Sequence, residues 1–346
     1  MPIICGCRRR SIRPLCNPIT LPWRKAITTR TLLPSVPPWS GRQTVKEPTK
    51  RHQIMSSKTG KVGVIGLGNM GGGIARNLSK AGYQVHVYDI SDRALKPFRK
   101  KATICEPTEM AAKCSVIFFV VHGSKEIEEL LSGRNGMLSA VRRNLVLYDL
   151  TTSDPDNTKR LARKTARKNV TYMDAGMTGG AVGADKGTLS LMIGGDKKAY
   201  KRTRKYLTPF TEQLFHVGKS GAGHTLKLIF NMVVHTNFLA VCEAGHIAKK
   251  AGIDLNDMID VFNAGNARSY ISEQRFPNHI LSGTWDGRSS VYNLHKDLGM
   301  AMTMVAKFGT TAKLGKNTHA YLKRAVKFGM SEKDFTRLYQ IFGEIT

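Results

Sequence analysis

The chain has 346 residues, which predicts two domains or one domain with a large appendage. Its hydrophobic content of 41% and charged content of 23% are typical of a soluble globular protein. The formal net charge of +29 is extreme, but the basic residues are spread along the chain without an aromatic-rich or zinc-finger-like pattern, so nucleic acid is disfavoured as a partner.

Basic clusters, apolar runs and cysteines exclude further classes of protein. The densest basic segments are residues 159–168 and 201–205, and the first places its charges four apart, as on the solvated face of a helix. The longest uncharged stretch near the middle, residues 228–242, is too short and too polar to span a bilayer. The six cysteines show neither a metal-ligand spacing nor a disulfide framework, so we expect a reducing compartment and no metal.

The first 55 residues are predicted to lie outside the fold, as a disordered leader or a non-native extension. They contain a single acidic residue, Glu47, many arginines, and prolines that would interrupt regular structure. Such a segment is either a mitochondrial transit peptide or upstream sequence read before a true start at Met55. The second interpretation places the protein in the cytoplasm and the first in the mitochondrial matrix.

From residue 61 to about 218, short apolar runs alternate with helix-length amphipathic segments. The predicted strands are residues 62–65, 84–88, 115–121, 144–148, 170–173, 189–193 and 214–217. Runs that are rich in β-branched residues and separated by helices are typical of a parallel sheet covered on both faces. The sequence therefore predicts an α/β fold, with a Rossmann-type doubly wound sheet forming a dinucleotide-binding domain over residues 56–219.

After Gly221 the strand pattern stops. Helical spacing is present at residues 226–250, 255–263, 293–308, 318–328 and 332–342. This predicts an all-helical domain over residues 220–346 for substrate binding and oligomerisation. The segment 226–250 is apolar on most sides, so we expect it to be covered partly by a second copy of the chain, in a dimer or a tetramer.

A glycine-rich turn connects the first predicted strand to the first helix, with the sequence Gly66-Leu67-Gly68-Asn69-Met70-Gly71. Such a turn brings backbone N–H groups and the positive end of a helix dipole to the pyrophosphate of a dinucleotide. Asp89 ends the second strand, where a carboxylate would bind the ribose hydroxyls and repel a 2'-phosphate. We therefore expect NAD as the cofactor, although the nearby Arg93 leaves NADP possible.

The chain resembles the β-hydroxyacid dehydrogenase family, which includes 3-hydroxyisobutyrate dehydrogenase, tartronate semialdehyde reductase and, more distantly, 6-phosphogluconate dehydrogenase. The resemblance runs from Lys61 nearly to the C-terminus. Its motifs are the glycine turn with Asn77-Leu78; Asp174-Ala175-Gly176-Met177-Thr178-Gly179-Gly180 with Gly183-Ala184 and Gly187; Gly221-Ala222-Gly223 with Lys227 and Asn231; and Lys296-Asp297-Leu298. It implies an NAD(P)-dependent oxidoreductase acting on a small carboxylate, in the dehydrogenase or the semialdehyde-reducing direction.

The resemblance also assigns roles around the substrate. Thr178, Gly179 and Gly180 would hold the substrate carboxylate, through a hydroxyl and converging backbone N–H groups. Lys227 would be the acid/base. Asn231, four residues further on the same helix face, would orient the substrate hydroxyl and the lysine. A lysine in an apolar segment suits this role because burial lowers its pKa.

Two further residues are implied at the cofactor. Thr152 matches a hydroxyl residue that touches the cofactor after the fifth strand, although it also lies where a helix cap before Pro155 is plausible. Lys296 matches a lysine that reaches the nicotinamide end. His122 stands where the family usually has a proline beside the nicotinamide. Substrate choice would depend on residues such as Arg268, Ser269, Tyr270 and Arg275.

Three alternatives bound the predicted activity. Decarboxylating relatives carry a histidine and a glutamate at the positions of Phe230 and Val234, so decarboxylation is disfavoured. An imine reductase of the same fold typically lacks the lysine at position 227. A catalytically inert dehydrogenase fold, used as a binding module on a polyanion, would also lack it.

Overall fold

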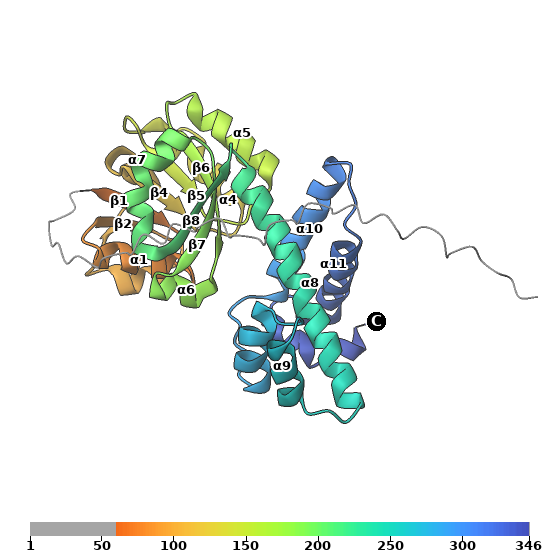
Figure 1. The fold of residues 1–346 in the computed structure, drawn as a ribbon. Coiled ribbons are helices and arrows are strands. Elements are labelled where there is room, and N and C mark those ends of the chain that lie inside the picture. The colour runs from red at the N-terminus through yellow and green to blue at the C-terminus, as the bar shows by residue number, and fades with distance from the viewer. Residues whose placement is uncertain (1–59, 346) are drawn as a thin grey trace, which may run out of the picture. The chain divides into compact units, whose positions relative to one another are not determined.

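In the computed structural model, residues 60–345 are described, and the predicted leader, residues 1–55, lies outside them. The described residues belong to a single compact unit. The division of that unit near residue 219 therefore stays a prediction, while the two kinds of architecture on either side of it are plain in Figure 1.

The sheet has eight strands in the order β3-β2-β1-β4-β5-β6-β7-β8. The strands are β1 (Lys61–Ile65), β2 (Gln84–Tyr88), β3 (Thr103–Ile104), β4 (Val116–Phe119), β5 (Val146–Asp149), β6 (Thr171–Thr178), β7 (Leu189–Gly194) and β8 (Thr211–Gly218). Neighbouring strands are parallel except β6 and β7, which are antiparallel. The predicted Rossmann-type sheet is thus confirmed. The sequence did not predict β3, which has only two residues.

Helices cover both faces of the sheet. They are α1 (Gly71–Lys80), α2 (Asp92–Leu95), α3 (Pro107–Lys113), α4 (Ser124–Leu131), α5 (Pro155–Ala166), α6 (Gly180–Lys186) and α7 (Lys197–Leu207), with 3-10 turns at Lys96–Phe98, Met137–Ser139 and Thr208–Phe210. Successive residues of one strand enter different cores: Val64 belongs to the same core as Ile74, whereas Ile65 belongs to the same core as Ile127. Because both faces are buried, the strands read as unbroken apolar runs.

After β8, the described residues form helices and one isolated bridge between Ser290 and Asp334. The helices are α8 (Ala222–Lys250), α9 (Leu255–Ala264), the π-helical segment Ile271–Leu281, α10 (Val291–Lys307) and α11 (Lys313–Ala325), followed by short turns at Val326–Met330, Phe335–Tyr339 and Phe342–Glu344. The helix predicted at residues 332–342 is wrong, because this stretch forms 3-10 turns and Asp334 caps the first of them. The segment 271–281 escaped prediction because Pro277 lies inside it.

The long helix α8 joins the sheet to the helical domain, and Figure 1 shows it running from β7 and β8 to the helices α10 and α11. It has 29 residues and is therefore longer than the uncharged stretch 228–242, which the sequence analysis judged too short to span a bilayer. By length and composition alone it could cross a membrane, with a mean hydropathy of 1.4 in its most apolar window. The core helix of a soluble protein passes the same test, and α8 packs against β6, β7, α10 and α11.

Candidate active site

The residues assigned to the cofactor and the substrate carboxylate lie at one edge of the sheet. The glycine turn follows β1, Asp89 follows β2, His122 follows β4, Thr152 follows β5 and Thr178 ends β6. These five strands are mutually parallel, so their carboxyl ends meet at the same edge. This edge is where doubly wound folds bind their ligands.

The glycine turn has room for a ligand at one position and none at two others. A Cβ at Gly66, whose φ is +90°, would lie 2.2 Å from the carbonyl oxygen of Val120, and one at Gly71 would lie 1.9 Å from that of Gly66. A Cβ at Gly68 would have no atom within 4 Å. Gly66 and Gly71 therefore close the turn, while Gly68 leaves open space over the backbone, as a bound pyrophosphate requires.

Asp89 is held beside this turn. Its Oδ2 accepts a hydrogen bond from the backbone N–H of Leu67 at 2.6 Å, and its Oδ1 accepts one from that of Ser91 at 2.8 Å. Each carboxylate oxygen can accept a second bond. The carboxylate thus stays available to ribose hydroxyls, while it also ties the end of β2 to the glycine turn.

The loop to which the resemblance assigns the substrate carboxylate follows β6 directly. Gly179 has a φ of +114° and Gly180 a φ of +62°, which are left-handed conformations that favour glycine. The loop continues into α6, whose end is fixed to α1: the side chain of Asn77 donates to the carbonyl of Ala184 at 2.8 Å. A Cβ at Gly73 would lie 2.7 Å from the carbonyl carbon of Ala184, so α1 and α6 are in backbone contact. Helix α1 and the loop that leads into α6 are therefore held together by direct contacts.

The start of α8 is fixed to β6 by Asp174. Its two carboxylate oxygens accept hydrogen bonds from the backbone N–H groups of Gly221, at 2.8 Å, and His224, at 3.0 Å. Asp174 thus satisfies donors that an α-helix leaves unpaired at its N-terminus. A Cβ at Gly223 would lie 2.3 Å from the carbonyl oxygen of Met192. The helix therefore begins in close contact with β6 and β7.

Lys227 follows one turn later and lies over the middle of β6. A Cβ built at Gly176 would lie 2.5 Å from the Cβ of Lys227. The ammonium nitrogen of Lys227 is 5.0 Å from the ring centroid of Phe230. Burial lowers the pKa of Lys227 to about 8, although the negative charge of Asp297 opposes this shift. The amine can therefore exchange a proton near neutral pH.

A polar cluster from α8 and α10 continues the site. Asn231 donates a hydrogen bond from its Nδ2 to the Oδ2 of Asp297 at 2.7 Å. The Nζ of Lys296 lies 3.7 Å from the Oδ1 of Asp297 and donates to the backbone carbonyl of His122 at 3.0 Å. Burial raises the pKa of Asp297, against the lowering effect of Lys296, Lys227 and Asn231. Lys296 thus brings the helical domain to the loop after β4.

Asp297 and His235 were not chosen as site residues from the sequence, although both lie near Lys227 in the structure. Thr152 and His122, which the sequence analysis named at the cofactor, make no side-chain contact with this cluster. Asp297 stood in the motif Lys296-Asp297-Leu298, which was the available signal. Burial and the charge of Lys227 lower the pKa of His235 to about 3, so this side chain is neutral. Thr152 is partly buried after β5, and the helix cap proposed for it is wrong because Asp154 caps α5. The imidazole of His122 is exposed; only its carbonyl contacts Lys296.

Two open clefts among the described residues lie elsewhere. A cleft of about 990 Å³ is lined by Tyr172, Gly195 and His216, and one of about 460 Å³ by Lys159, Val217 and Ile229. Neither is lined by Lys227 or Gly179. Within residues 60–345, no group of three or more His, Cys, Asp or Glu side chains could hold a metal ion.

Comparisons with known proteins cover both halves of the chain. The family model for the NAD binding domain of 6-phosphogluconate dehydrogenase matches residues 61–218, and the model for NAD-binding of NADP-dependent 3-hydroxyisobutyrate dehydrogenase matches residues 221–342. A probable mitochondrial 3-hydroxyisobutyrate dehydrogenase of Dictyostelium discoideum is 31% identical over 304 residues, which are 85% of this chain and 95% of that protein.

Two further relatives agree. The 2-(hydroxymethyl)glutarate dehydrogenase of Eubacterium barkeri is 28% identical over 84% of this chain and 97% of its own. The solved structure of 3-hydroxyisobutyrate dehydrogenase of Mycobacterium tuberculosis with L-serine is 25% identical, with a TM-score of 0.74 over 82% of this chain and 99% of that one. The protein belongs to the β-hydroxyacid dehydrogenase family of NAD(P)-dependent oxidoreductases.

Proposed function

We propose that the protein transfers a hydride between NAD(P) and a small β-hydroxy acid, interconverting the hydroxyl with an aldehyde or ketone without decarboxylation. The observation that carries this proposal is Lys227, whose amine has a pKa of about 8 beside Asn231 and Asp297. When bound, the dinucleotide supplies the nicotinamide ring that accepts or returns the hydride.

Lys227 is the acid/base in this proposal. In the oxidative direction its neutral amine accepts the proton of the substrate hydroxyl. The hydrogen on the carbon that bears this hydroxyl leaves as hydride for the nicotinamide ring. In the reverse direction its ammonium returns that proton to the oxygen. Asn231 orients the hydroxyl, and Asp297 fixes Asn231 through the 2.7 Å hydrogen bond. Asp297 also keeps the amine pKa from falling further.

The substrate carboxylate would bind at Thr178, Gly179 and Gly180. The left-handed glycines allow successive backbone N–H groups to converge on one anion, and the Thr178 hydroxyl adds a donor. The cofactor would lie on the glycine turn, Gly66 to Gly71 including Leu67, Asn69 and Met70. Thr152 would contact it after β5, and Lys296 would lie at its nicotinamide end. Asp89 favours NAD over NADP because its charge opposes a 2'-phosphate.

Two observations favour this activity over its rivals. Phe230 and Val234 occupy the positions where decarboxylating relatives have ionisable side chains, and the Phe230 ring lies beside the Lys227 amine. Lys227 itself is retained, partly buried and with a lowered pKa, which an inert binding module has no need to preserve and an imine reductase typically lacks.

The test is an assay of NAD and NADP turnover with 3-hydroxyisobutyrate, glycerate, threonate and serine. Lys227→Ala should lower turnover by at least ~10²-fold while NAD binding survives, because only the acid/base is removed. Unchanged turnover would exclude the lysine from the mechanism. Salt-sensitive nucleic-acid binding without any turnover would favour the inert binding module.

The oligomeric state is part of the proposal. Leu226, Ile229, Val233 and Ile247 recur at helical spacing along α8, and each is more than a third exposed. An apolar face of this length favours a second copy of the chain as its cover, in a dimer or a tetramer. Gel filtration of the wild type and of Val233→Asp would test this, and a monomeric wild type would contradict it.

We further propose that the protein works in the cytoplasm or, if residues 1–55 act as a transit peptide, in the mitochondrial matrix. The Dictyostelium discoideum relative is named as mitochondrial, which supports the second location. A fusion of residues 1–55 to a fluorescent protein would decide between the two. We expect neither a membrane nor nucleic acid among the partners.

A further inference from the structure

Arg275 extends from the helical domain to the Thr178–Gly180 loop of the Rossmann-type domain. It lies on the segment Ile271–Leu281, and its Nη2 is 3.4 Å from the position that a Cβ on Gly180 would occupy. Gly180 is one of the residues proposed to hold the substrate carboxylate. The guanidinium therefore lies beside the place where an anion would bind.

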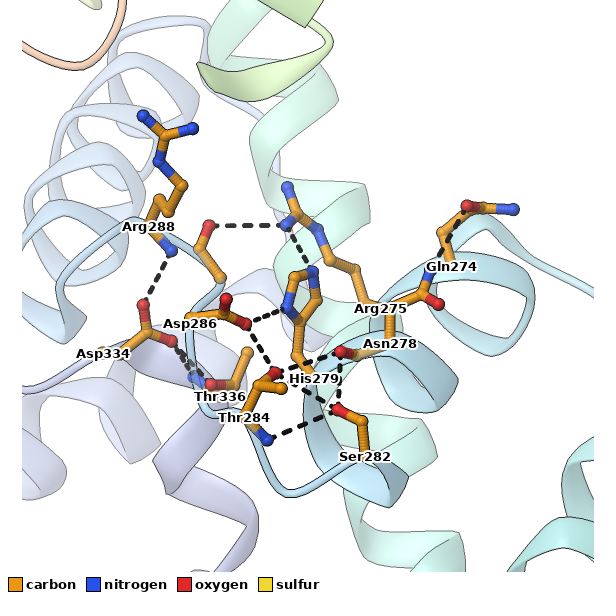
Figure 2. Close-up of polar contacts among 11 residues, drawn as sticks. Gln274, Arg275, Asn278, His279, Ser282, Thr284, Asp286, Arg288, Asp334 and Thr336 are labelled. Carbon is orange, nitrogen blue, oxygen red and sulfur yellow. Dashed lines mark hydrogen bonds and ion pairs between the residues drawn. The ribbon is translucent and has the colours of Figure 1, made fainter. Parts of the chain in front are cut away.

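The guanidinium of Arg275 has no anionic partner among the described residues. Its Nη1 donates a long hydrogen bond of 3.4 Å to the carbonyl of Gly287 and contacts the Nε2 of His279 at 3.4 Å (Figure 2). By contrast, Arg268 pairs with Glu273 at 2.8 Å. Nη2 and Nε of Arg275 make no hydrogen bond within residues 60–345. A partly buried cation in this state is stabilised when an anion binds beside it.

Two aromatic rings flank the same guanidinium. Its central carbon is 5.6 Å from the ring centroid of Tyr270 and 5.7 Å from that of Phe335. Such rings stabilise a cation through their faces and leave its N–H edge free for a planar, bidentate partner. The environment therefore suits a carboxylate better than a neutral hydroxyl or amide.

His279 and Asp286 hold Arg275 in this position. The Nδ1 of His279 lies 2.7 Å from the Oδ1 of Asp286, which also accepts a hydrogen bond from Thr284 at 2.6 Å (Figure 2). The hydrogen bonds from Thr284 and His279 lower the pKa of Asp286, so it is ionised and accepts the Nδ1 proton. In the tautomer that carries its proton on Nδ1, His279 has Nε2 as an acceptor for Arg275.

We propose that Arg275 is a specificity-determining residue that binds a substrate carboxylate beside Gly180, with His279 and Asp286 as its positioning residues. This inference rests on the proposed function. The carboxylate is either the one that the Thr178–Gly180 loop holds or a second one at the far end of a dicarboxylic hydroxy acid. In both cases the chemistry is a bidentate, charge-assisted contact.

Kinetics with Arg275→Gln test the proposal. Its KM for a hydroxy acid should rise by about 10–10²-fold, as expected for loss of a charge-assisted contact, while kcat changes little. The KM for the amide of the same substrate, which has no charge, should stay unchanged. Arg275→Lys should recover part of the effect, and His279→Gln should show a smaller rise. The matched control is Arg324→Gln, which removes an arginine on α11 that also lies over a tyrosine ring, 5.9 Å from that of Tyr321, and should leave KM unchanged.

The choice of substrate separates the two carboxylates. If Arg275 binds the carboxylate that the Thr178–Gly180 loop holds, Arg275→Gln should raise KM equally for 3-hydroxyisobutyrate and for a hydroxy dicarboxylate. If it binds a second carboxylate, KM should rise for the dicarboxylate alone. An equal rise in KM for the acid and its amide, or no rise for either acid, would overturn the proposal.

A binding experiment makes the outcome independent of turnover. Calorimetry with malonate in the presence of NAD should show weaker binding to Arg275→Gln than to the wild type, by about 10-fold or more. Equal binding, or no binding to the wild type, would reject Arg275 as a carboxylate ligand. If malonate binding depends on Arg275 but no hydroxy acid is turned over, the proposed reaction fails and the anion site stands.

Discussion

The stem of Lys227 lies directly against Gly176: a Cβ at position 176 would be 2.5 Å from the Cβ of Lys227 and 2.9 Å from its Cγ. The atoms that would clash are the Cβ and Cγ of Lys227, which lie next to the backbone of α8. Rotation about the distal bonds of the side chain therefore cannot relieve the contact. The start of α8 is itself fixed by Asp174. The absence of a side chain at 176 therefore determines where the proposed acid/base lies.

Gly176→Ala should accordingly impair the chemical step. The added methyl group displaces Lys227 from Asn231 and Asp297, and we expect kcat to fall by about 10–10²-fold, because general acid/base catalysis depends on position. NAD affinity, measured by fluorescence titration, should change little. Gly343→Ala is the control, since a Cβ there meets no atom within 4 Å. A Gly176→Ala enzyme with wild-type kcat would show that the lysine tolerates displacement.

The pH dependence of turnover should report Lys227. The oxidative reaction needs the neutral amine, so its kcat/KM should rise as pH increases through about 8, while the reductive rate should fall over the same range. The charge of Asp297 raises the pKa of Lys227, so Asp297→Asn should move the pH profiles of both the oxidative and the reductive reaction to lower pH. A pH profile that does not move in Asp297→Asn would remove the electrostatic coupling of these residues from the mechanism.

Much of this architecture could be predicted from the sequence because each signal is local. Gly66, Gly68 and Gly71 follow an apolar run, and Lys227 and Asn231 are one helical turn apart. Asp297 and Arg275 could not be assigned contacts, because their partners lie 66 and 95 residues away in the chain, at Asn231 and Gly180. Only tertiary packing brings those pairs together.

The reversal of β7 was also beyond the sequence, and for a similar reason. The run at residues 189–193 predicts a buried strand, and an apolar strand gives the same pattern whether it is parallel or antiparallel. The short connection through α6 decides the direction, because Gly187 ends that helix in a left-handed conformation with a φ of +75° and β7 turns back along β6.

Cofactor preference should depend on Asp89. Asp89→Asn keeps an acceptor for the N–H of Leu67 but removes the charge that opposes a 2'-phosphate. We expect the ratio of kcat/KM for NAD to that for NADP to fall by at least ~10-fold, mainly through KM. Arg93→Gln, which removes the nearby exposed cation, should shift the ratio the other way. Both ratios unchanged would mean that other residues select the cofactor.

Asp174 should contribute more to stability than its place in a substrate motif suggests. It is fully buried, and its two oxygens accept the N–H groups of Gly221 and His224. Asp174→Ala leaves both donors buried without a partner, which should lower the free energy of unfolding by about 2–5 kcal/mol. Asp174→Asn keeps one acceptor and should lose less. Urea denaturation measures both, with Asp254→Ala as the control because Asp254 caps the exposed start of α9 through one backbone bond. If Asp174→Ala were no less stable than Asp254→Ala, the start of α8 would be held by its contacts with β6 and β7 alone.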